Sequence, residues 1–205
     1  MGAILNEFGE LVDNTTNESI NKNKKKFEYL DYINEHIRNV NKAYGYLFLP
    51  LLDIEIVSDV LDEREFKNAI LNVQKYIVDH DVSKFSDEEF EAYRANFYPT
   101  DYEKTLDDNY QMMVKQEFEE AWKHHYENNR HHTLYWLNKE TNTINDMDLE
   151  GIIEMICDWE AMSIKFNSKT VDWYNNKADK EKSQMSIKTK QIVEEILFNI
   201  LKLES

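Results

Sequence analysis

Glycine and proline, which form tight turns and end helices, are rare here, with four Gly and two Pro among 205 residues. So few turn-forming residues disfavour a β-sandwich or barrel, because their many short strands need many turns. No Gly-rich loop that would cradle a phosphate is present. Aromatic residues make up 13% of the chain and supply material for a packed interior. The sequence therefore predicts an all-α protein with a helical bundle as its main domain.

The chain is strongly acidic, with 40 acidic and 24 basic residues and a net charge of -16. This charge repels phosphate backbones and disfavours duplex DNA or RNA as a partner. It also serves the simpler purpose of solubility. A small anionic substrate remains compatible with it where a metal ion or a local Lys or Arg offsets the field.

Cysteine usage and hydropathy suggest a compartment. Cys157 is the only cysteine, which excludes an internal disulfide and suits a reducing cytosol. No apolar run approaches the roughly 20 residues of a membrane span, and no secretory signal is visible. We therefore expect a cytoplasmic protein without membrane contact.

The apolar pattern divides the chain near residue 26. Residues 1–12 predict a short amphipathic helix, and residues 13–26 are almost devoid of apolar side chains, which predicts a flexible connector. Residues 27–205 form the main helical domain. Ser86 and Glu89 match a capping box and predict a helix start, while Asp62 is expected to cap an earlier helix. Apolar residues at helical spacing predict further helices over residues 27–44, 108–127, 147–165 and 186–203. Phe27 is expected in the core-facing stripe of the first of these helices, with His36 at the edge of that stripe, and Met112 is expected to point inward on the second.

Histidine and aspartate interrupt the apolar helix faces. The helix capped by Asp62 carries an apolar stripe that ends three residues before His80, so His80 points toward the core with Asp81 beside it. Asp158 lies within the apolar stripe of residues 147–165. Buried imidazole and carboxylate groups need partners, and both are ligands of Zn, Mn, Fe and similar ions. The candidate metal ligands are His36, His80, Asp81, His124 or His125, His131 or His132, and Asp158.

Ligands from several helices can hold one or two divalent ions, which we expect to be Mn, Zn, Fe, Ni or Mg. Asp81 is the natural bridge, because it adjoins His80 and is central in the ligand order. His124 and His125 point about 100° apart on a helix, and we expect His125 to be the ligand. The simpler interpretation is that each histidine is a hydrogen-bonded core residue or a solvated residue in a helix end or loop.

The order of these residues resembles the HD-domain superfamily of metal-dependent phosphohydrolases. His80-Asp81-Val82-Ser83-Lys84 is similar to the His-Asp-x-Gly-Lys motif of its cyclic-dinucleotide phosphodiesterases, with Ser83 in place of Gly. Over about residues 28–200 the chain more closely resembles a phage and bacterial family of unknown function. The motifs that carry this resemblance are His80–Phe85, Ala121–Tyr126, Asn129–His132 and Glu154–Trp159.

The resemblance implies an HD-like helical bundle with the metal site among its core helices. It implies one ion held by His36, His80, Asp81 and Asp158. A second ion would use Asp81 with His125 and His131 or His132, although the gap between His125 and His131 is shorter than in many relatives.

The predicted activity is hydrolysis of a small nucleotide or another phosphate ester by metal-activated water. Asp81 and Lys84 are the expected catalytic residues, with Lys84, Arg94 and Arg130 as phosphate contacts; Lys84 is equally well explained as a surface residue closing a helix. Two alternatives stay open. One is a di-iron oxygenase, and the other is a catalytically silent protein that sequesters a nucleotide or binds a host partner. The sequence leaves the oligomeric state open.

Overall fold

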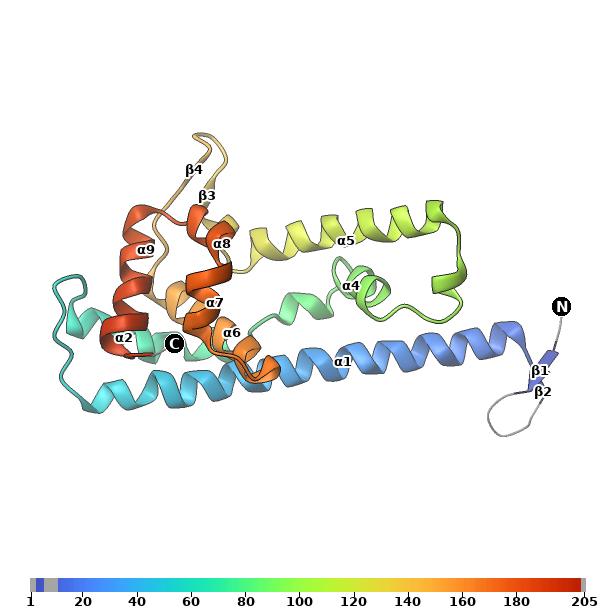
Figure 1. Ribbon diagram of the computed structural model, residues 1–205, viewed down its shortest axis with the longest axis horizontal. Helices are drawn as coiled ribbons and strands as arrows, with labels where there is room; N and C mark the ends of the chain where they lie inside the picture. Colours follow the sequence, from blue (N-terminus) through green and yellow to red (C-terminus); the bar gives the residue numbers. More distant parts are fainter. Residues whose placement is uncertain (1–2, 6–10, 204–205) are drawn as a thin grey trace. The chain divides into compact units, whose positions relative to one another are not determined.

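The computed structural model describes residues 3–5 and 11–203, with side chains from residue 17 onward. Helices make up most of this part of the chain and the strands are short, which confirms the all-α fold (Figure 1). The chain divides into two compact units, each built from two segments. Unit 1 comprises Met1–Asn34 and Ser83–His125, and unit 2 comprises Glu35–Val82 and Tyr126–Ser205.

Unit 1 has an aromatic core. The ring of Tyr29 lies 5.1 Å from Phe90 and 5.7 Å from Tyr98, and Tyr93 lies 5.2 Å from Phe118, all measured between centroids. Its elements are β1 (Ala3–Leu5), β2 (Leu11–Asp13), the first part of α1 (Asn14–Leu47), η2 (Val82–Phe85, whose first residue belongs to unit 2), α4 (Phe90–Phe97), η3 (Glu103–Thr105) and most of α5 (Asp108–Asn128).

The N-terminal region differs from its prediction. Where a short helix was expected, Ala3–Leu5 and Leu11–Asp13 pair as antiparallel strands, and residues 1–2 and 6–10 of that expected helix lie outside the described part. Residues 14–26, expected as a connector, are the first turns of α1. Extending an existing helix needs no new nucleus, so a polar run can continue the helix that the apolar stripe of α1 stabilises.

Unit 2 is organised around α6 (Leu149–Phe166), which contacts α2 (Glu63–Asn72), α7 (Thr170–Lys177) and α9 (Ile187–Glu194) (Figure 1). Asp148 caps α6 by accepting a hydrogen bond from the backbone N–H of Gly151, and Asn167 ends it in the left-handed conformation. The other elements of unit 2 are the end of α1, η1 (Leu49–Asp53), α3 (Gln74–Val78), η4 (Thr133–Trp136), β3 (Leu137–Asn138), β4 (Thr143–Ile144), α8 (Asp179–Ser183) and η5 (Glu195–Ile200).

The buried face of α1 is rotated slightly from the predicted one. Phe27, expected in the core, is 67% exposed, whereas Tyr29 is buried. His36 therefore lies in the middle of the buried stripe rather than at its edge. The stripe consists of Tyr29, Ile33, His36, Val40, Ala43 and Leu47.

Asp62 caps α2 as predicted, because its side chain accepts a hydrogen bond from the backbone N–H of Glu65. The expected single helix is divided at Val73 into α2 and α3. Among the described residues, no helix is both long and apolar enough to cross a membrane.

Candidate metal centre

His80 and Asp81 lie in unit 2, in the turn that follows α3. His80 is 1% exposed and Asp81 is 2% exposed. Asp81 has a φ of 57°, in the left-handed region that few residues other than Gly, Asn and Asp adopt. The apolar face that leads to this turn is buried as predicted, and consists of Phe66, Ile70, Val73 and Ile77.

His36 from α1 and Asp158 from α6 approach this turn. His36 Nε2 lies 3.2 Å from His80 Nε2, 3.4 Å from Asp81 Oδ2 and 3.1 Å from Asp158 Oδ1. His80 Nε2 lies 3.6 Å from Asp81 Oδ1 and 3.9 Å from Asp158 Oδ1. Side chains from three separate segments thus direct nitrogen and oxygen atoms into one small volume.

The loop between α5 and η4 adds His131 and His132. His131 Nε2 lies 3.4 Å from Asp81 Oδ1, and the His131 ring centroid lies 4.3 Å from that of His80. His132 is half-buried and stacks on Tyr126, with ring centroids 3.8 Å apart. Six of the seven predicted ligands therefore lie within unit 2.

These buried groups can hold a metal ion. His36, His80 and Asp81 offer ligand atoms within 4.8 Å of one another, and so do His80, His131 and Asp158. Imidazole nitrogen combined with carboxylate oxygen suits Zn, Mn, Fe and Ni better than it suits Mg, which prefers oxygen ligands.

Glu154 is a site residue that the sequence analysis missed. It is 3% exposed, and its Oε1 lies 2.9 Å from His80 Nδ1 and 3.1 Å from His131 Nδ1. Residues four apart share one face of a helix, so its position four residues before Asp158 was the available signal. Glu154 therefore contacts two of the predicted ligands through Nδ1, while the Nε2 atoms of the same rings face Asp81.

The electrostatics of the cluster favour ionised carboxylates. Burial alone would raise the pKa of Asp158, but the hydrogen bond from His36 and the nearby histidines hold it well below its usual value. Burial opposes ionisation of Glu154 too, yet His131 and His80 lower its pKa. Burial lowers the pKa of His80. Burial would also lower the pKa of His131, but its interactions with Asp81 and Glu154 raise it to about 10. A metal ion that binds His131 must therefore displace a proton.

The loop that carries His131 is attached to the start of α6. The backbone carbonyl of Arg130 accepts a hydrogen bond of 2.8 Å from Trp136 Nε1, and the Arg130 guanidinium forms an ion pair with Asp148. A side chain at Gly151 would place its Cβ 3.0 Å from the Arg130 carbonyl oxygen. Because Gly151 has no side chain, the backbone at Arg130 can lie close to α6, and this contact positions the neighbouring His131.

His125, the seventh predicted ligand, belongs to unit 1. Its Nδ1 lies 2.9 Å from Glu89 Oε2 and 3.1 Å from Ser83 Oγ, and His124 Nδ1 lies 2.9 Å from Glu89 Oε1. His125 is 2% exposed, whereas the His124 side chain is 40% exposed. The role of His125 as a ligand stays a prediction.

Glu89 does not act as the predicted capping residue. Helix α4 begins after it, at Phe90, and no side chain caps this helix. The Glu89 carboxylate is fully buried and interacts instead with His124 and His125. Burial opposes its ionisation, but these histidines lower its pKa.

Arg94 and Lys84, predicted as phosphate contacts, also lie in unit 1. Arg94 is 1% exposed and binds Glu103 through two hydrogen bonds of 2.6 and 2.7 Å. This bidentate pair gives Arg94 a structural role. Lys84 Nζ lies 5.7 Å from the ring centroid of Tyr93. Substrate contact by either residue stays a prediction.

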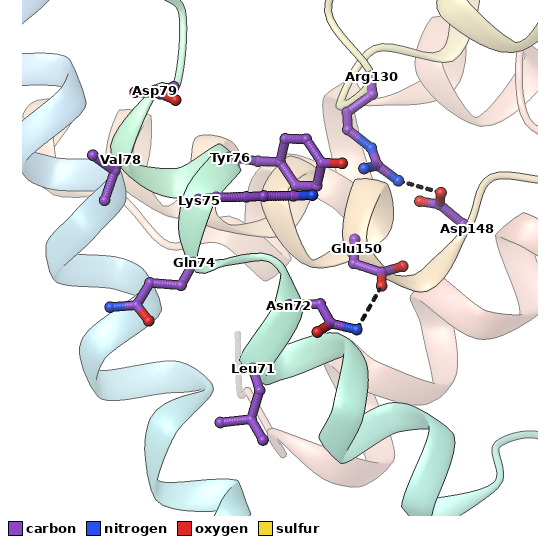
Figure 2. Close-up of a pocket in the computed structure, with 10 residues that line it drawn as sticks. All are labelled: Leu71, Asn72, Gln74, Lys75, Tyr76, Val78, Asp79, Arg130, Asp148 and Glu150. Carbon is purple, nitrogen blue, oxygen red and sulfur yellow. Dashed lines mark hydrogen bonds and ion pairs between the residues drawn. The ribbon is translucent and has the colours of Figure 1, made fainter.

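Arg130, the third predicted contact, borders a groove of about 940 Å³ in unit 2 (Figure 2). Its guanidinium carbon lies 4.1 Å from the ring centroid of Tyr76, and Lys75 Nζ lies 4.6 Å from the same centroid. Because Arg130 already pairs with Asp148, its role as a phosphate contact stays a prediction. The groove is lined by Leu71, Asn72, Gln74, Lys75, Tyr76, Val78, Asp79, Arg130, Asp148 and Glu150.

Comparison with known proteins places most of the chain in one family. Residues 25–199 match the model of a family described as a family of unknown function, DUF5662. The chain belongs to the DUF5662 family. No curated protein and no solved structure matches the chain. The match covers every predicted metal ligand of this DUF5662 protein as well as Glu154.

Proposed function

We propose that this DUF5662 protein is a metal-dependent hydrolase of a small phosphate ester, with nucleotides as the preferred substrate class. The observation that carries the proposal is the convergence of the buried side chains of His36, His80, Asp81 and His131 with the half-buried Asp158 in unit 2. A bound divalent ion would polarise a phosphoryl oxygen and lower the pKa of a coordinated water. The likeness to HD-domain phosphohydrolases supports the same reaction class.

The ligand roles follow from the distances. His36 Nε2 lies close to His80 Nε2, Asp81 Oδ2 and Asp158 Oδ1, whereas His131 Nε2 lies close to Asp81 Oδ1. Asp81 Oδ2 faces His36 at 3.4 Å, whereas Asp81 Oδ1 faces His80 at 3.6 Å and His131 at 3.4 Å. A carboxylate whose two oxygens face different histidines is suited to bridge two ions. Asp81 is therefore the proposed bridge, and His132 is a further candidate for the second ion.

The charge of the chain agrees with a metal-dependent reaction. A net charge of -16 repels an anionic ester, and Asp81, Glu154 and Asp158 add local negative charge. A divalent ion at these carboxylates would offset that charge where the phosphate must lie.

The metal content of protein purified without chelators tests the proposal, together with turnover of a panel of nucleotides and simple phosphate esters. We expect one or two ions per chain, and hydrolysis that requires them. Asp81→Ala should lose both the metal and the activity. Asp79→Ala is the matched control, because Asp79 is exposed and lies two residues earlier in the same turn; it should retain its metal.

Other results would select a different function. No metal after reconstitution, with Asp81→Ala folding normally, would refute the enzyme proposal. Iron with a mixed-valent spectrum would favour a di-iron oxygenase over a hydrolase. Tight binding of a nucleotide without turnover would favour a protein that sequesters a nucleotide or contacts a host partner.

A further inference from the structure

Glu154 is placed to control two histidine ligands at once. A single oxygen, Oε1, lies 2.9 Å from His80 Nδ1 and 3.1 Å from His131 Nδ1. An ionised carboxylate only accepts hydrogen bonds, so each Nδ1 must carry a proton and donate it. The metal-binding nitrogen of each ring is then Nε2.

The Nε2 atoms face the opposite side of the two rings, toward Asp81. Their distances to Asp81 Oδ1 are 3.6 Å for His80 and 3.4 Å for His131. Both rings are almost fully buried and their centroids lie 4.3 Å apart, so neither ring can turn independently of its neighbours. The protons on one side of the rings and the ligand atoms on the other are thus fixed by the same carboxylate.

We infer that Glu154 is the positioning residue of the centre, because it holds His80 and His131 in the tautomer that presents both Nε2 atoms toward Asp81. The inference rests on the metal centre of the proposed function but not on the reaction. Carboxylates behind metal-binding histidines fix the tautomer and orientation of the ring and strengthen metal binding. Glu154 is unusual in serving two ligands from one oxygen, so its loss should misplace both.

Unit 1 contains a second carboxylate of the same kind. Glu89 is fully buried, and its two oxygens each lie 2.9 Å from an Nδ1 atom, one of His124 and one of His125. By the same argument, Nδ1 of each of these rings donates to Glu89. Glu89 thus fixes the tautomer of His124 and His125 within unit 1.

The first test needs no substitution. The full chain is loaded with Zn²⁺, which is diamagnetic, and long-range ¹⁵N–¹H correlation spectra report which nitrogen of each ring carries the proton. We expect Nδ1–H with a zinc-bound Nε2 for His80 and His131. Coordination through Nδ1 in either ring, or an absence of zinc binding, would overturn the inference.

The second test compares Glu154→Leu with Glu150→Leu, the same substitution one helical turn earlier on α6. Glu154→Leu removes the oxygen that accepts from both Nδ1 atoms, whereas glutamine could keep an accepting oxygen at the Oε1 position. We expect its Zn²⁺ affinity to fall about 10- to 100-fold and its spectrum to lose Nδ1–H in at least one ring, while the control stays within twofold. An unchanged affinity and an unchanged tautomer pattern in Glu154→Leu would overturn the inference. A protein that passes both tests yet hydrolyses no phosphate ester would refute the proposed function alone.

Discussion

The two glycines of unit 2 that lie within helices should respond in opposite directions to replacement by alanine. Gly45 lies inside α1, and a Cβ added there meets no atom within 4 Å. Gly151 lies in the first turn of α6, where a Cβ would lie 3.0 Å from the Arg130 carbonyl oxygen, 3.2 Å from Asp148 Oδ1 and 3.4 Å from Trp136. Comparing the two variants therefore separates the effect of helix propensity on stability from the effect of the close contact between α6 and the loop that carries His131.

The magnitudes follow from these contacts. Replacing Gly by Ala in an open helix position raises the free energy of unfolding by about 0.5–1 kcal/mol, which is the expected result for Gly45→Ala. Gly151→Ala has the same gain, but the backbone at Arg130 must shift by a few tenths of an ångström. Overpacking of this kind costs about 1–3 kcal/mol, so we expect Gly151→Ala to be less stable than the wild type by about 1 kcal/mol. The two variants should differ by about 2 kcal/mol.

Urea unfolding of the metal-free protein measures this difference, with the same dependence on denaturant assumed for both variants because each adds one methyl group. For a chain of this size, 1 kcal/mol changes Tm by about 2–4 °C, so the two variants should differ by about 4–8 °C. The shift at Arg130 should also weaken Zn²⁺ binding in Gly151→Ala but not in Gly45→Ala. Equal stabilisation by both substitutions would refute the close approach of the loop to α6.

Two further predictions concern pH and metal removal. Glu103 is buried against Arg94, and although burial alone would raise its pKa, the Arg94 hydrogen bonds lower it from 4.5 to about 2. Its stabilising effect is therefore complete above about pH 4.5 and is lost as the pH falls toward 2. Glu103→Gln should lower the free energy of unfolding at pH 7 by about 3 kcal/mol. When urea unfolding is measured at several pH values, the variant should also lose less of this free energy than the wild type as the pH falls from about 4.5 to 2; an equal loss in both proteins would contradict this. Chelation should lower Tm in scanning calorimetry, since an ion at 100 times its Kd stabilises by about 2.7 kcal/mol, and a Tm independent of metal would argue against a site in the folded protein.

The sequence predicted features that depend on local periodicity. The all-α fold, the Asp62 cap and the burial of His80 are confirmed, because each depends on residues close together in the chain. Glu154 could also have been found, since it lies one helical turn before Asp158 on α6. It was overlooked because carboxylates on helices are so often exposed.

Other features depend on contacts between distant segments, and periodicity does not report them. Met112, expected to point inward on α5, is 62% exposed, while Val114 is buried. Both fit an amphipathic helix, and only the packing of unit 1 selects between them. The conformation of His131 and His132 depends on Trp136 and Gly151, residues whose contact with this loop is not visible in a sequence.

The composition of the cluster is itself an argument for function. On α6, Ile152, Ile153 and Ile156 are fully buried, and Glu154 and Asp158 place carboxylates on the side of the same helix that lies opposite Ile152 and Ile156. Replacing buried ionic groups by apolar residues of similar volume is often neutral or stabilising, by up to about 4 kcal/mol. The left-handed backbone of Asp81 adds a cost of about 1–2 kcal/mol. Stability alone does not favour two buried carboxylates and a third, half-buried one beside three buried histidines, whereas a divalent ion accounts for their number, their charge and the direction of their ligand atoms.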